Sequence, residues 1–206
     1  MKILVINTAG MTAQLALQAD NKNYFSELDA SMKHSENLLP EIEKLLLNAN
    51  INLNELDYLA VNVGPGSFTG LRISIATAKA MLVTYPNLKA IKLNSFEMLA
   101  NNFFENNKNN QIDIVLNALS GLYFVSTFDK NKFSEPKMVE KSELAKLKNI
   151  VSDEKIENYD VKLAKFCCEN MLKVAIDKVA KNEICNESEL VPLYIRPSQA
   201  EANLKK

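Results

Sequence analysis

Two short segments in different halves of the chain share one pattern, in which an apolar run ends at an asparagine, a tight turn follows, and a second apolar run begins. The first copy is KILVIN (2–7) with TAQLALQ (12–18), and the second is DIVLN (113–117) with LYFVSTF (122–128). Apolar runs rich in β-branched residues around a turn are typical of β-hairpins. Superposing Asn7 on Asn117 brings the apolar positions into register. The pattern indicates a weak internal repeat, and therefore two related halves that each begin with a hairpin.

The segments that follow the first hairpin alternate between strand and helix patterns. Apolar residues recur at helical spacing in 34–49, 71–85 and 95–104, whereas 23–28, 56–63 and 88–93 are short runs typical of strands. Strands that alternate with helices favour an α/β fold. Asn37 is the expected N-cap of the first helix, which would place Pro40 in its first turn. Ser95 is the expected N-cap of the third helix.

An asparagine-rich stretch, NNFFENNKNNQ at 101–111, indicates a loop between two lobes. We therefore expect an N-terminal lobe at 1–104 and a smaller C-terminal lobe at 105–206. The second lobe should contain its own hairpin, a long helix at 161–181 and an extended tail at 190–197. It has fewer helical segments than the first, so the two copies would be unequal.

A glycine-rich segment, GPGSFTG at 64–70, joins a predicted strand to a predicted helix, as phosphate-binding loops do. A P-loop requires Lys and then Ser or Thr after its last glycine, but a leucine and an arginine follow here. A dinucleotide-binding fingerprint requires a third glycine where Thr69 stands. A less specific anion site at the helix N-terminus stays open, because the backbone N–H groups of 67–69 would lie there.

We favour a structural interpretation of the same glycine loop. Gly64 and Gly66 permit a tight turn from strand to helix, Pro65 fixes a backbone angle, and Ser67 or Thr69 caps the helix. The residues assigned to the loop are Gly64, Pro65, Gly66, Ser67, Thr69 and Gly70.

The helix expected after the loop is apolar on nearly all sides. Only Arg72, Ser74, Thr77 and Lys79 interrupt its apolar residues. The sheet can cover one face, so another element must cover a second face. Small side chains on that second face would admit a neighbouring helix closely. Together with the leucine-rich segment 38–49, this helix predicts a two-helix surface for a protein partner.

Composition excludes several classes of function. The 24 basic residues nearly balance the 25 acidic ones, so no net field favours nucleic acid or an anionic membrane. No apolar run approaches the roughly 20 residues that span a bilayer, and the N-terminus does not resemble a signal peptide, which predicts a cytoplasmic protein. Cys167, Cys168 and Cys185 lack the number and spacing of a disulfide framework or a zinc site. His34 is the only histidine, and we expect it at a helix entry or an interface.

Several segments together resemble the TsaB (YeaZ) family, bacterial subunits of the tRNA threonylcarbamoyladenosine transferase complex. The most characteristic of them is GPGSFTGLRISIATAKAM, and the others are ILVINT, HSENLLPEIEKLL, NSFEMLA and VPLYIR. The likeness is dense over about residues 1–100, thin through 129–185, and returns at 190–196.

The resemblance implies an α/β protein with the two-lobed actin/hexokinase/Hsp70-like fold, whose lobes each begin with a hairpin. It also implies a noncatalytic subunit that pairs with the catalytic subunit TsaD through N-terminal helices, with the ATPase subunit TsaE completing the complex. TsaD, with its bound metal, modifies the adenosine next to the anticodon of certain tRNAs, so tRNA would concern this chain only indirectly. No cofactor is expected in this chain, because ATP and metal belong to the partner subunits. The predicted partner-binding residues are Leu38, Leu39, Ile42, Leu46, Phe68, Arg72, Ile73, Ala76, Thr77 and Ala80.

The chain departs from the family pattern at both hairpin turns. Asn7 and Asn117 stand where family members often carry Asp, and Leu119 stands where they carry Arg. An amide cannot act as a base, so nucleotide chemistry is not expected here. The metal-binding His-x-x-x-His pair of TsaD cannot be built from one histidine, so no catalytic residue and no metal ligand is predicted. An actin-fold ATPase or kinase, a metalloprotease and a freestanding homodimer are the alternatives, and homodimerisation through the same helices stays open.

Overall fold

The computed structural model describes residues 1–28, 33–107, 111–129 and 132–195, and these form two compact units. Unit 1 contains Met1–Met98 and Cys167–Pro192, whereas unit 2 contains Leu99–Phe166 and the described residues 193–195. The chain therefore leaves unit 1 and later returns to it. This division differs from the predicted boundary at residue 104.

Unit 1 is built on a five-stranded mixed sheet with the strand order β3-β2-β1-β4-β5. The strands are β1 (Ile3–Asn7), β2 (Ala13–Ala19), β3 (Lys22–Leu28), β4 (Tyr58–Asn62) and β5 (Lys89–Leu93). β1 and β2 form the predicted hairpin, β3 pairs antiparallel with β2, and β4 and β5 run parallel to β1. Every residue of β1 is buried, as expected for a central strand covered on both faces.

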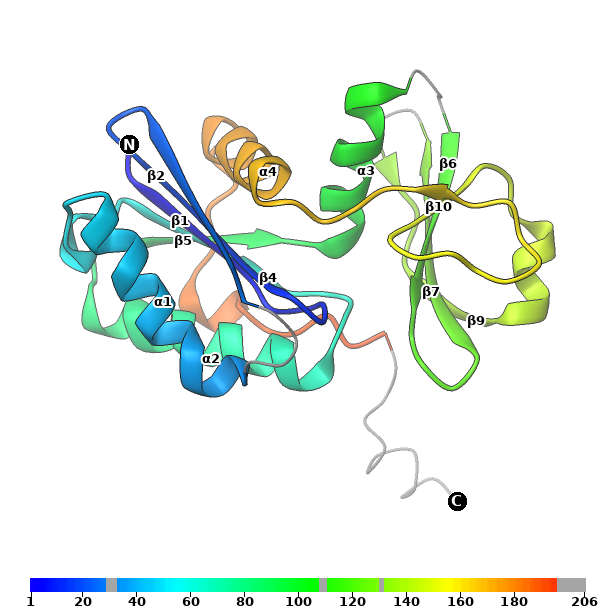
Figure 1. The fold of residues 1–206 in the computed structure, drawn as a ribbon, viewed down its shortest axis with the longest axis horizontal. Helices are drawn as coiled ribbons and strands as arrows, with labels where there is room; N and C mark the ends of the chain where they lie inside the picture. Colours follow the sequence, from blue (N-terminus) through cyan, green and yellow to red (C-terminus); the bar gives the residue numbers. More distant parts are fainter. Residues whose placement is uncertain (29–32, 108–110, 130–131, 196–206) are drawn as a thin grey trace. The chain divides into compact units, whose positions relative to one another are not determined.

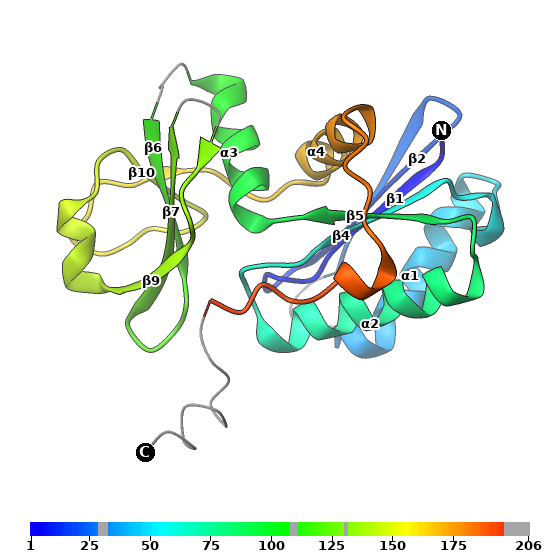
Figure 2. The ribbon, with the colours of Figure 1, turned by 180° about the vertical axis from the view of Figure 1, so that it is seen from behind.

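Helices cover both faces of this sheet, as Figures 1 and 2 show from opposite sides. α1 (His34–Asn48) and α2 (Phe68–Thr84) lie on one face, and α4 (Cys168–Ala180) lies on the other. The core on the α1 and α2 side joins aliphatic side chains from sheet and helices, among them Leu4, Leu15, Leu38, Ile42, Leu59, Ile75 and Met81.

Two predicted helix caps are corrected by the structure. The carbonyl of Lys33 accepts hydrogen bonds from the backbone N–H groups of Glu36 (3.0 Å) and Asn37 (3.1 Å), so α1 begins at His34 and Asn37 already lies within it. Pro40 consequently falls in the second turn of the helix rather than the first.

The cap of α3 (Ser95–Asn106) is Asn94 rather than Ser95. The Asn94 side-chain oxygen accepts from the Glu97 N–H at 2.9 Å, and the Glu97 carboxylate accepts from the Asn94 N–H at 3.3 Å. This reciprocal pair is a capping box. It leaves the Ser95 hydroxyl available for other contacts.

Unit 2 repeats the strand order of unit 1, with the order β11-β10-β6-β7-β8 and β9 also paired with β7. Its strands are β6 (Gln111–Asn117), β7 (Leu122–Asp129), β8 (Lys132–Phe133), β9 (Lys137–Glu140), β10 (Ile150–Ser152) and β11 (Lys162–Leu163). As in unit 1, a hairpin supplies the central strand, and two later strands join it in parallel. The internal repeat predicted from the two hairpins is therefore confirmed, because the strands of both sheets follow the same order.

The second copy has fewer helices, as predicted. A 3₁₀ helix, η2 (Lys141–Lys146), stands where unit 1 has α1, and the chain between β10 and β11 forms no helix. The small core beneath η2 is made of Val115, Val125, Val139, Leu144, Ile150 and Ile156.

The helix expected at 161–181 is shorter than predicted and belongs to unit 1. Residues 162–163 pair with β10 as β11, and α4 begins only at Cys168. Its buried side chains pack against β2 and β5 of the unit 1 sheet, and include Met171, Leu172, Val174 and Ala175. The predicted boundary at residue 104 placed this helix in the C-terminal lobe, whereas the helix packs on the sheet of unit 1.

Candidate functional site

The glycine loop packs directly on the turn between β1 and β2. The Ser67 N–H donates to the Ala9 carbonyl at 2.7 Å, and the Thr8 hydroxyl donates to the Gly70 carbonyl at 2.6 Å. A Cβ atom at Gly70 would lie 1.8 Å from the Thr8 carbonyl oxygen. A Cβ at Gly66 would lie 2.6 Å from both the Cβ and the carbonyl oxygen of Ala9. These glycines are required because two backbone segments meet there without room for a side chain.

The same loop starts α2. The Ser67 side-chain oxygen accepts a hydrogen bond from the Gly70 N–H at 3.2 Å, which confirms Ser67 as the N-cap. Thr69 lies inside the first turn and is exposed. Gly64 has a backbone φ of 113°, which side-chain-bearing residues rarely adopt. The structure thus has a left-handed backbone at Gly64 and a helix cap at Ser67, as the structural interpretation of the loop predicts for these two residues.

A buried network of amides and hydroxyls supports the loop from below. The Asn7 side-chain oxygen accepts from the Asn62 amide at 2.8 Å, and the Asn7 amide donates to Gln14 at 3.2 Å. Asn62 also accepts from the Gly64 N–H at 2.9 Å. The Ser95 hydroxyl donates to the Pro65 carbonyl at 2.7 Å.

This network holds the end of β1, the end of β4 and the glycine loop in one arrangement. Of these residues, Asn7 was predicted as a hairpin-turn residue and Ser95 only as a helix cap, whereas Asn62 was not predicted. The signal for Asn62 was a polar residue at the end of an apolar strand, two positions before the first glycine of the loop.

The turn of the second hairpin differs from the first because a carboxylate lies beside it. The Asn117 amide donates to the Glu154 carboxylate at 2.8 Å, and the Asn117 oxygen accepts from the Leu119 N–H at 2.8 Å. Leu119 has a φ of 65° in this turn and is exposed. Sequence reasoning missed Glu154, because the pairing of β10 with β6 brings it to Asn117 from far along the chain.

The predicted partner-binding residues divide into two groups in the structure. Leu38, Ile42 and Leu46 are buried in the core of unit 1. They form the side of α1 that packs on the sheet, and Ile42 and Leu46 also lie at the bottom of a groove beside this helix. The other residues reach the surface in whole or in part, and are Leu39, Phe68, Arg72, Ile73, Ala76, Thr77 and Ala80.

The outer side of α2 carries small apolar residues. Ala76, Ala80 and Val83 are exposed at helical spacing, and Arg72 is exposed at the same side one turn earlier. The Arg72 guanidinium lies 5.0 Å from the ring centre of Phe68, which is itself 45% exposed. The inner side of α2 is buried through Leu71, Ser74, Ile75, Ala78 and Met81.

A groove of about 470 Å³ is lined by α1, by the segment 51–54 that follows it and by the C-terminal end of α2. Leu39, Glu43 and Leu47 contribute its wall on α1, and Met81 and Tyr85 contribute from the end of α2. Leu39 is 57% exposed and Leu47 is 70% exposed. Sequence reasoning missed Glu43 and Leu47, although both continue the row that begins at Leu39 with a spacing of one turn.

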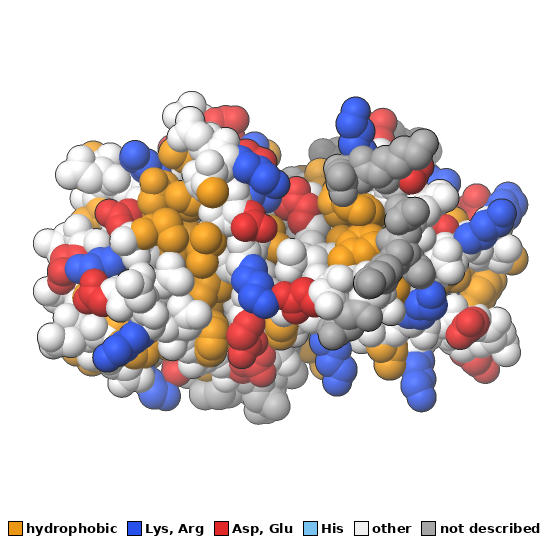
Figure 3. All heavy atoms as spheres, turned by 90° about the horizontal axis from the view of Figure 1, so that it is seen from above, with side chains coloured by type: hydrophobic (Ala, Val, Ile, Leu, Met, Phe, Trp, Pro, Cys, Tyr) orange, Lys and Arg blue, Asp and Glu red, His pale blue; other side chains and the backbone are white. Residues whose placement is uncertain are grey.

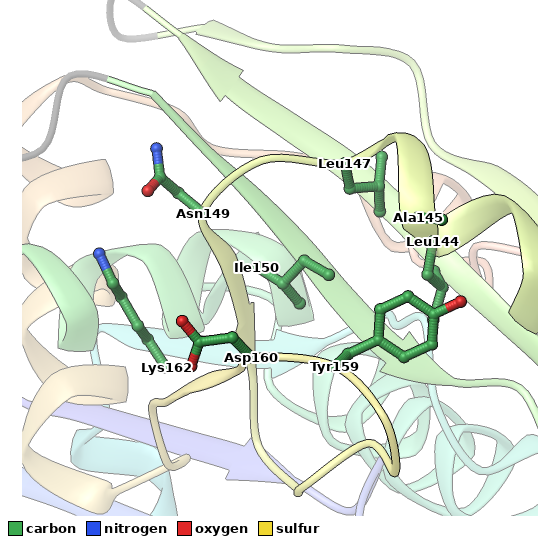
Figure 4. A pocket seen from close by; sticks show the side chains of 8 residues that line it. All are labelled: Leu144, Ala145, Leu147, Asn149, Ile150, Tyr159, Asp160 and Lys162. Atoms are coloured by element: carbon green, nitrogen blue, oxygen red, sulfur yellow. The ribbon is translucent and has the colours of Figure 1, made fainter.

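Unit 2 contains a smaller pocket of about 240 Å³. Figure 4 shows Leu147, Ile150 and Tyr159 on one side of it and the polar ends of Asn149, Asp160 and Lys162 on the other. The Tyr159 hydroxyl donates to the Lys141 carbonyl at 2.7 Å and so fixes the apolar wall. None of the predicted site residues lines this pocket.

The surface charge is mixed on the face that Figure 3 shows. Acidic and basic side chains alternate there around a band of hydrophobic ones, and no large area of a single sign stands out.

The thiols of Cys168 and Cys185 lie in surroundings that disfavour the reactive thiolate. Burial, assisted by the nearby Glu27 carboxylate, raises the pKa of Cys168 to about 12. Burial also raises the pKa of Cys185. Nucleophilic cysteines require a lowered pKa, so neither thiol is suited to that role.

Within the described ranges, no three His, Cys, Asp or Glu side chains cluster as metal ligands would. The side chain of His34 lies outside the described part of the chain. No described helix combines the length and the apolar character that crossing a membrane would require.

Comparison with known proteins shows which proteins this chain is similar to. Residues 28–127 match the family model of TsaD, tRNA N6-adenosine threonylcarbamoyltransferase. The chain is 30% identical over 129 residues to the tRNA threonylcarbamoyladenosine biosynthesis protein TsaB of Buchnera aphidicola subsp. Schizaphis graminum, covering 63% of this chain and 61% of that protein. It is 27% identical over 133 residues to TsaB of Escherichia coli K12, covering 64% and 57%. These matches support the TsaB (YeaZ) family for this chain.

The solved structures show which fold this chain shares. A Pseudomonas aeruginosa protein described as similar to the peptidase YeaZ matches with a TM-score of 0.78 at 18% identity, over 95% of this chain and 99% of that one. The fold is thus the predicted two-lobed actin/hexokinase/Hsp70-like fold, with a duplicated strand order. The chain spans less than two thirds of the length of the TsaB proteins that it matches in sequence.

Proposed function

We propose that this TsaB-family chain is a noncatalytic subunit that supports a TsaD-type catalytic subunit in tRNA threonylcarbamoyladenosine biosynthesis. The names of its relatives support the pathway. The single structural observation that carries the subunit role is the outer side of α1 and α2, where Leu39, Ala76 and Ala80 are exposed on helices whose inner sides are buried against the sheet.

The small side chains of α2 suit contact with another helix. Alanine allows two helix backbones to approach closely, so a partner helix can pack along Ala76 and Ala80 with Ile73 and Thr77 at its edges. Leu39 extends the same surface onto α1. The match of the TsaD family model to residues 28–127 includes both helices.

The end of β1 supports a noncatalytic role. Both ends of the Asn7 amide are hydrogen bonded to other residues of the chain, and the glycine loop is packed on the adjacent turn. An actin-fold ATPase would need a carboxylate at this position to organise magnesium and water. Glu154 beside Asn117 is a carboxylate at the second turn only.

The remaining features of the proposal follow from the subunit role. This chain carries no cofactor, while ATP and metal are held by partner subunits, including a TsaE-type ATPase. It contacts tRNA only through the complex and works in the cytoplasm, where tRNA is modified. A homodimer through the same helices is the alternative that uses this surface without TsaD.

The direct test is complex formation with the TsaD-type subunit of the same organism. We expect the two purified chains to elute together in size-exclusion chromatography, and the Ala80→Glu variant to elute separately because a charged side chain would be buried in the contact. Ala180→Glu is the matched control, since Ala180 is exposed on α4 at the other face of the sheet. Separate elution of the unmodified chains, or a complex that tolerates Ala80→Glu, would contradict the proposal.

A further inference from the structure

The pocket of unit 2 borders a segment where the second copy of the fold has no helix. In unit 1, α2 connects the parallel strands β4 and β5 and covers them. In unit 2, the corresponding residues 153–161 between β10 and β11 are irregular. The space of about 240 Å³ is bounded by η2, by the start of β10 and by the end of this irregular segment (Figure 4). The pocket therefore belongs to the part of unit 2 that differs most from unit 1.

The floor and one wall of this pocket are apolar and held in place. Leu144 and Ile150 are buried and belong to the small core beneath η2, and Leu147 packs against that core. The Tyr159 ring forms the wall, and its hydroxyl is already satisfied because it donates to the Lys141 carbonyl at 2.7 Å. An apolar group of a ligand can therefore be buried here without breaking a hydrogen bond of the protein.

The opposite side of the pocket carries two charges of opposite sign. Asp160 and Lys162 are exposed, and neither forms a salt bridge with a residue that the structure describes. The Lys162 ammonium lies 5.8 Å from the ring centre of Phe103, within reach of a cation–π attraction. The Asn149 amide donates to the Gln111 carbonyl at 3.4 Å, so its side-chain oxygen is a further acceptor at this rim.

The backbone of the rim is fixed by the protein itself. The buried Asp113 carboxylate accepts from the Lys148 N–H at 2.7 Å, and the Asp113 N–H donates to the Asn149 carbonyl at 3.3 Å. Asn149 has a φ of 52°, a left-handed conformation that asparagine adopts more readily than most residues. A rim that is already ordered loses little conformational entropy when a ligand binds.

The size and the charges of the pocket define the class of ligand. Clefts that hold drug-sized ligands measure roughly 300–1,000 Å³, so a pocket of about 240 Å³ is suited to a smaller molecule. The rim suits a molecule with both an ammonium and a carboxylate, and the floor requires an apolar group beside them. The end of a peptide carries only one of these two charges, whereas a free amino acid carries both on one carbon atom.

We propose that this pocket binds a free α-amino acid with an aliphatic or aromatic side chain. Its ammonium pairs with Asp160, its carboxylate pairs with Lys162, and its side chain lies on the floor against Leu147 and Ile150. The site is made by unit 2 alone, so the proposal does not rest on the subunit role.

The test is a nuclear magnetic resonance titration of the full isotope-labelled chain with L-leucine and L-phenylalanine. We expect saturable shifts of the amide signals of 144–162 with at least one of them, and none with glycine, which lacks the apolar group. Asp160→Asn and Lys162→Met should each weaken that binding by about tenfold or more, because each removes a charged contact. The matched controls Glu135→Gln and Lys137→Met make the same charge changes on exposed residues outside the pocket, and should leave the affinity within about twofold.

Two analogues of leucine assign each charge to its partner. Isocaproate lacks the ammonium, so the affinity that it retains should be the same with and without Asp160→Asn. Isoamylamine lacks the carboxylate, so its affinity should not respond to Lys162→Met. The absence of saturable shifts with both amino acids would overturn the proposal. Binding that Asp160→Asn and Lys162→Met leave unchanged would also overturn it, because the pocket would then be only an apolar cavity. Thermal melts of each variant confirm that it is folded.

Discussion

Individual residues at the start of α2 show how a motif that resembles a phosphate loop can serve packing instead. Gly66 and Gly70 face the backbone of Ala9 and Thr8, and a polar network beneath them joins Asn7 to the loop through Asn62. The side-chain N and O atoms buried in the described residues all have hydrogen-bond partners. Such a network is rigid, because breaking one bond would leave a buried polar group unpaired.

The glycine contacts predict a sharp difference between two Gly→Ala substitutions. Gly70→Ala should destabilise the chain by about 1–3 kcal/mol or more, because its Cβ would lie 1.8 Å from the Thr8 carbonyl oxygen and the backbone must move. Gly10→Ala is the control, since its Cβ would have no neighbour nearer than 3.7 Å. Urea denaturation followed by circular dichroism measures both. Equal stability of the two variants would show that the loop does not need this close approach.

At the scale of elements, most strands and helices could be predicted from the sequence because their patterns are local. The spacing of Leu38, Ile42 and Leu46 identified α1, and the alternation of runs identified both hairpins. The sequence could not decide which apolar row of α1 faces the sheet, because Leu39 and Leu47 form a second row beside the first. It also could not assign α4 to a sheet, since packing between distant segments leaves no local pattern. The network around Asn62 was missed for the same reason.

The segment that follows α4, residues 185–190, contacts both α2 and the sheet of unit 1. Cys185 donates its N–H to the Ala90 carbonyl at 2.9 Å, Glu187 pairs with Lys79 of α2 at 3.5 Å, and Leu190 is fully buried in the core of unit 1. These contacts join residues far along the chain to the helix that carries the proposed partner surface. The segment thus contributes to the position of α2.

Leu190 should therefore matter more than its place near the end of the described chain suggests. We expect Leu190→Ala to lower the free energy of unfolding by about 2–5 kcal/mol, because it leaves a cavity in a closed core. Val191→Ala is the control at the next position, where the side chain is 56% exposed, and should change stability by less than about 0.5 kcal/mol. Chemical denaturation measures both values. If Leu190→Ala lowered the free energy of unfolding only slightly, the packing of this segment on unit 1 would contribute little to the stability of the chain.

At the scale of the whole molecule, two copies of one topology have different helical complements. Unit 1 carries α1 and α2 where unit 2 carries only η2 and an irregular segment. The surface that we assign to a protein partner is thus found in one copy and not in the other. A duplicated fold of this kind can lose the features of one half while the other half retains its own.

The isolated chain should bind nucleotide weakly or not at all. The Ser67 N–H is engaged by Ala9, and Asn7 stands at the end of β1 where a carboxylate would be needed. Titration of the isolated chain with ATP and magnesium by calorimetry should give no saturable heat up to millimolar ATP. A micromolar dissociation constant would contradict this expectation and would favour the ATPase alternative.

The return of α4 to the first sheet has a consequence for synthesis on the ribosome. All five strands of unit 1 are available once residue 93 has emerged from the ribosome. The helix that covers the second face of their sheet is formed by residues 168–180, which are synthesised later. Until then, the apolar side chains of β1 and β2 on that face have no cover from α4, and nascent chains in that state are prone to aggregation. If the ribosome stalls while it synthesises unit 2, one apolar face of the unit 1 sheet stays exposed. Chaperones bind exposed apolar surfaces of this kind.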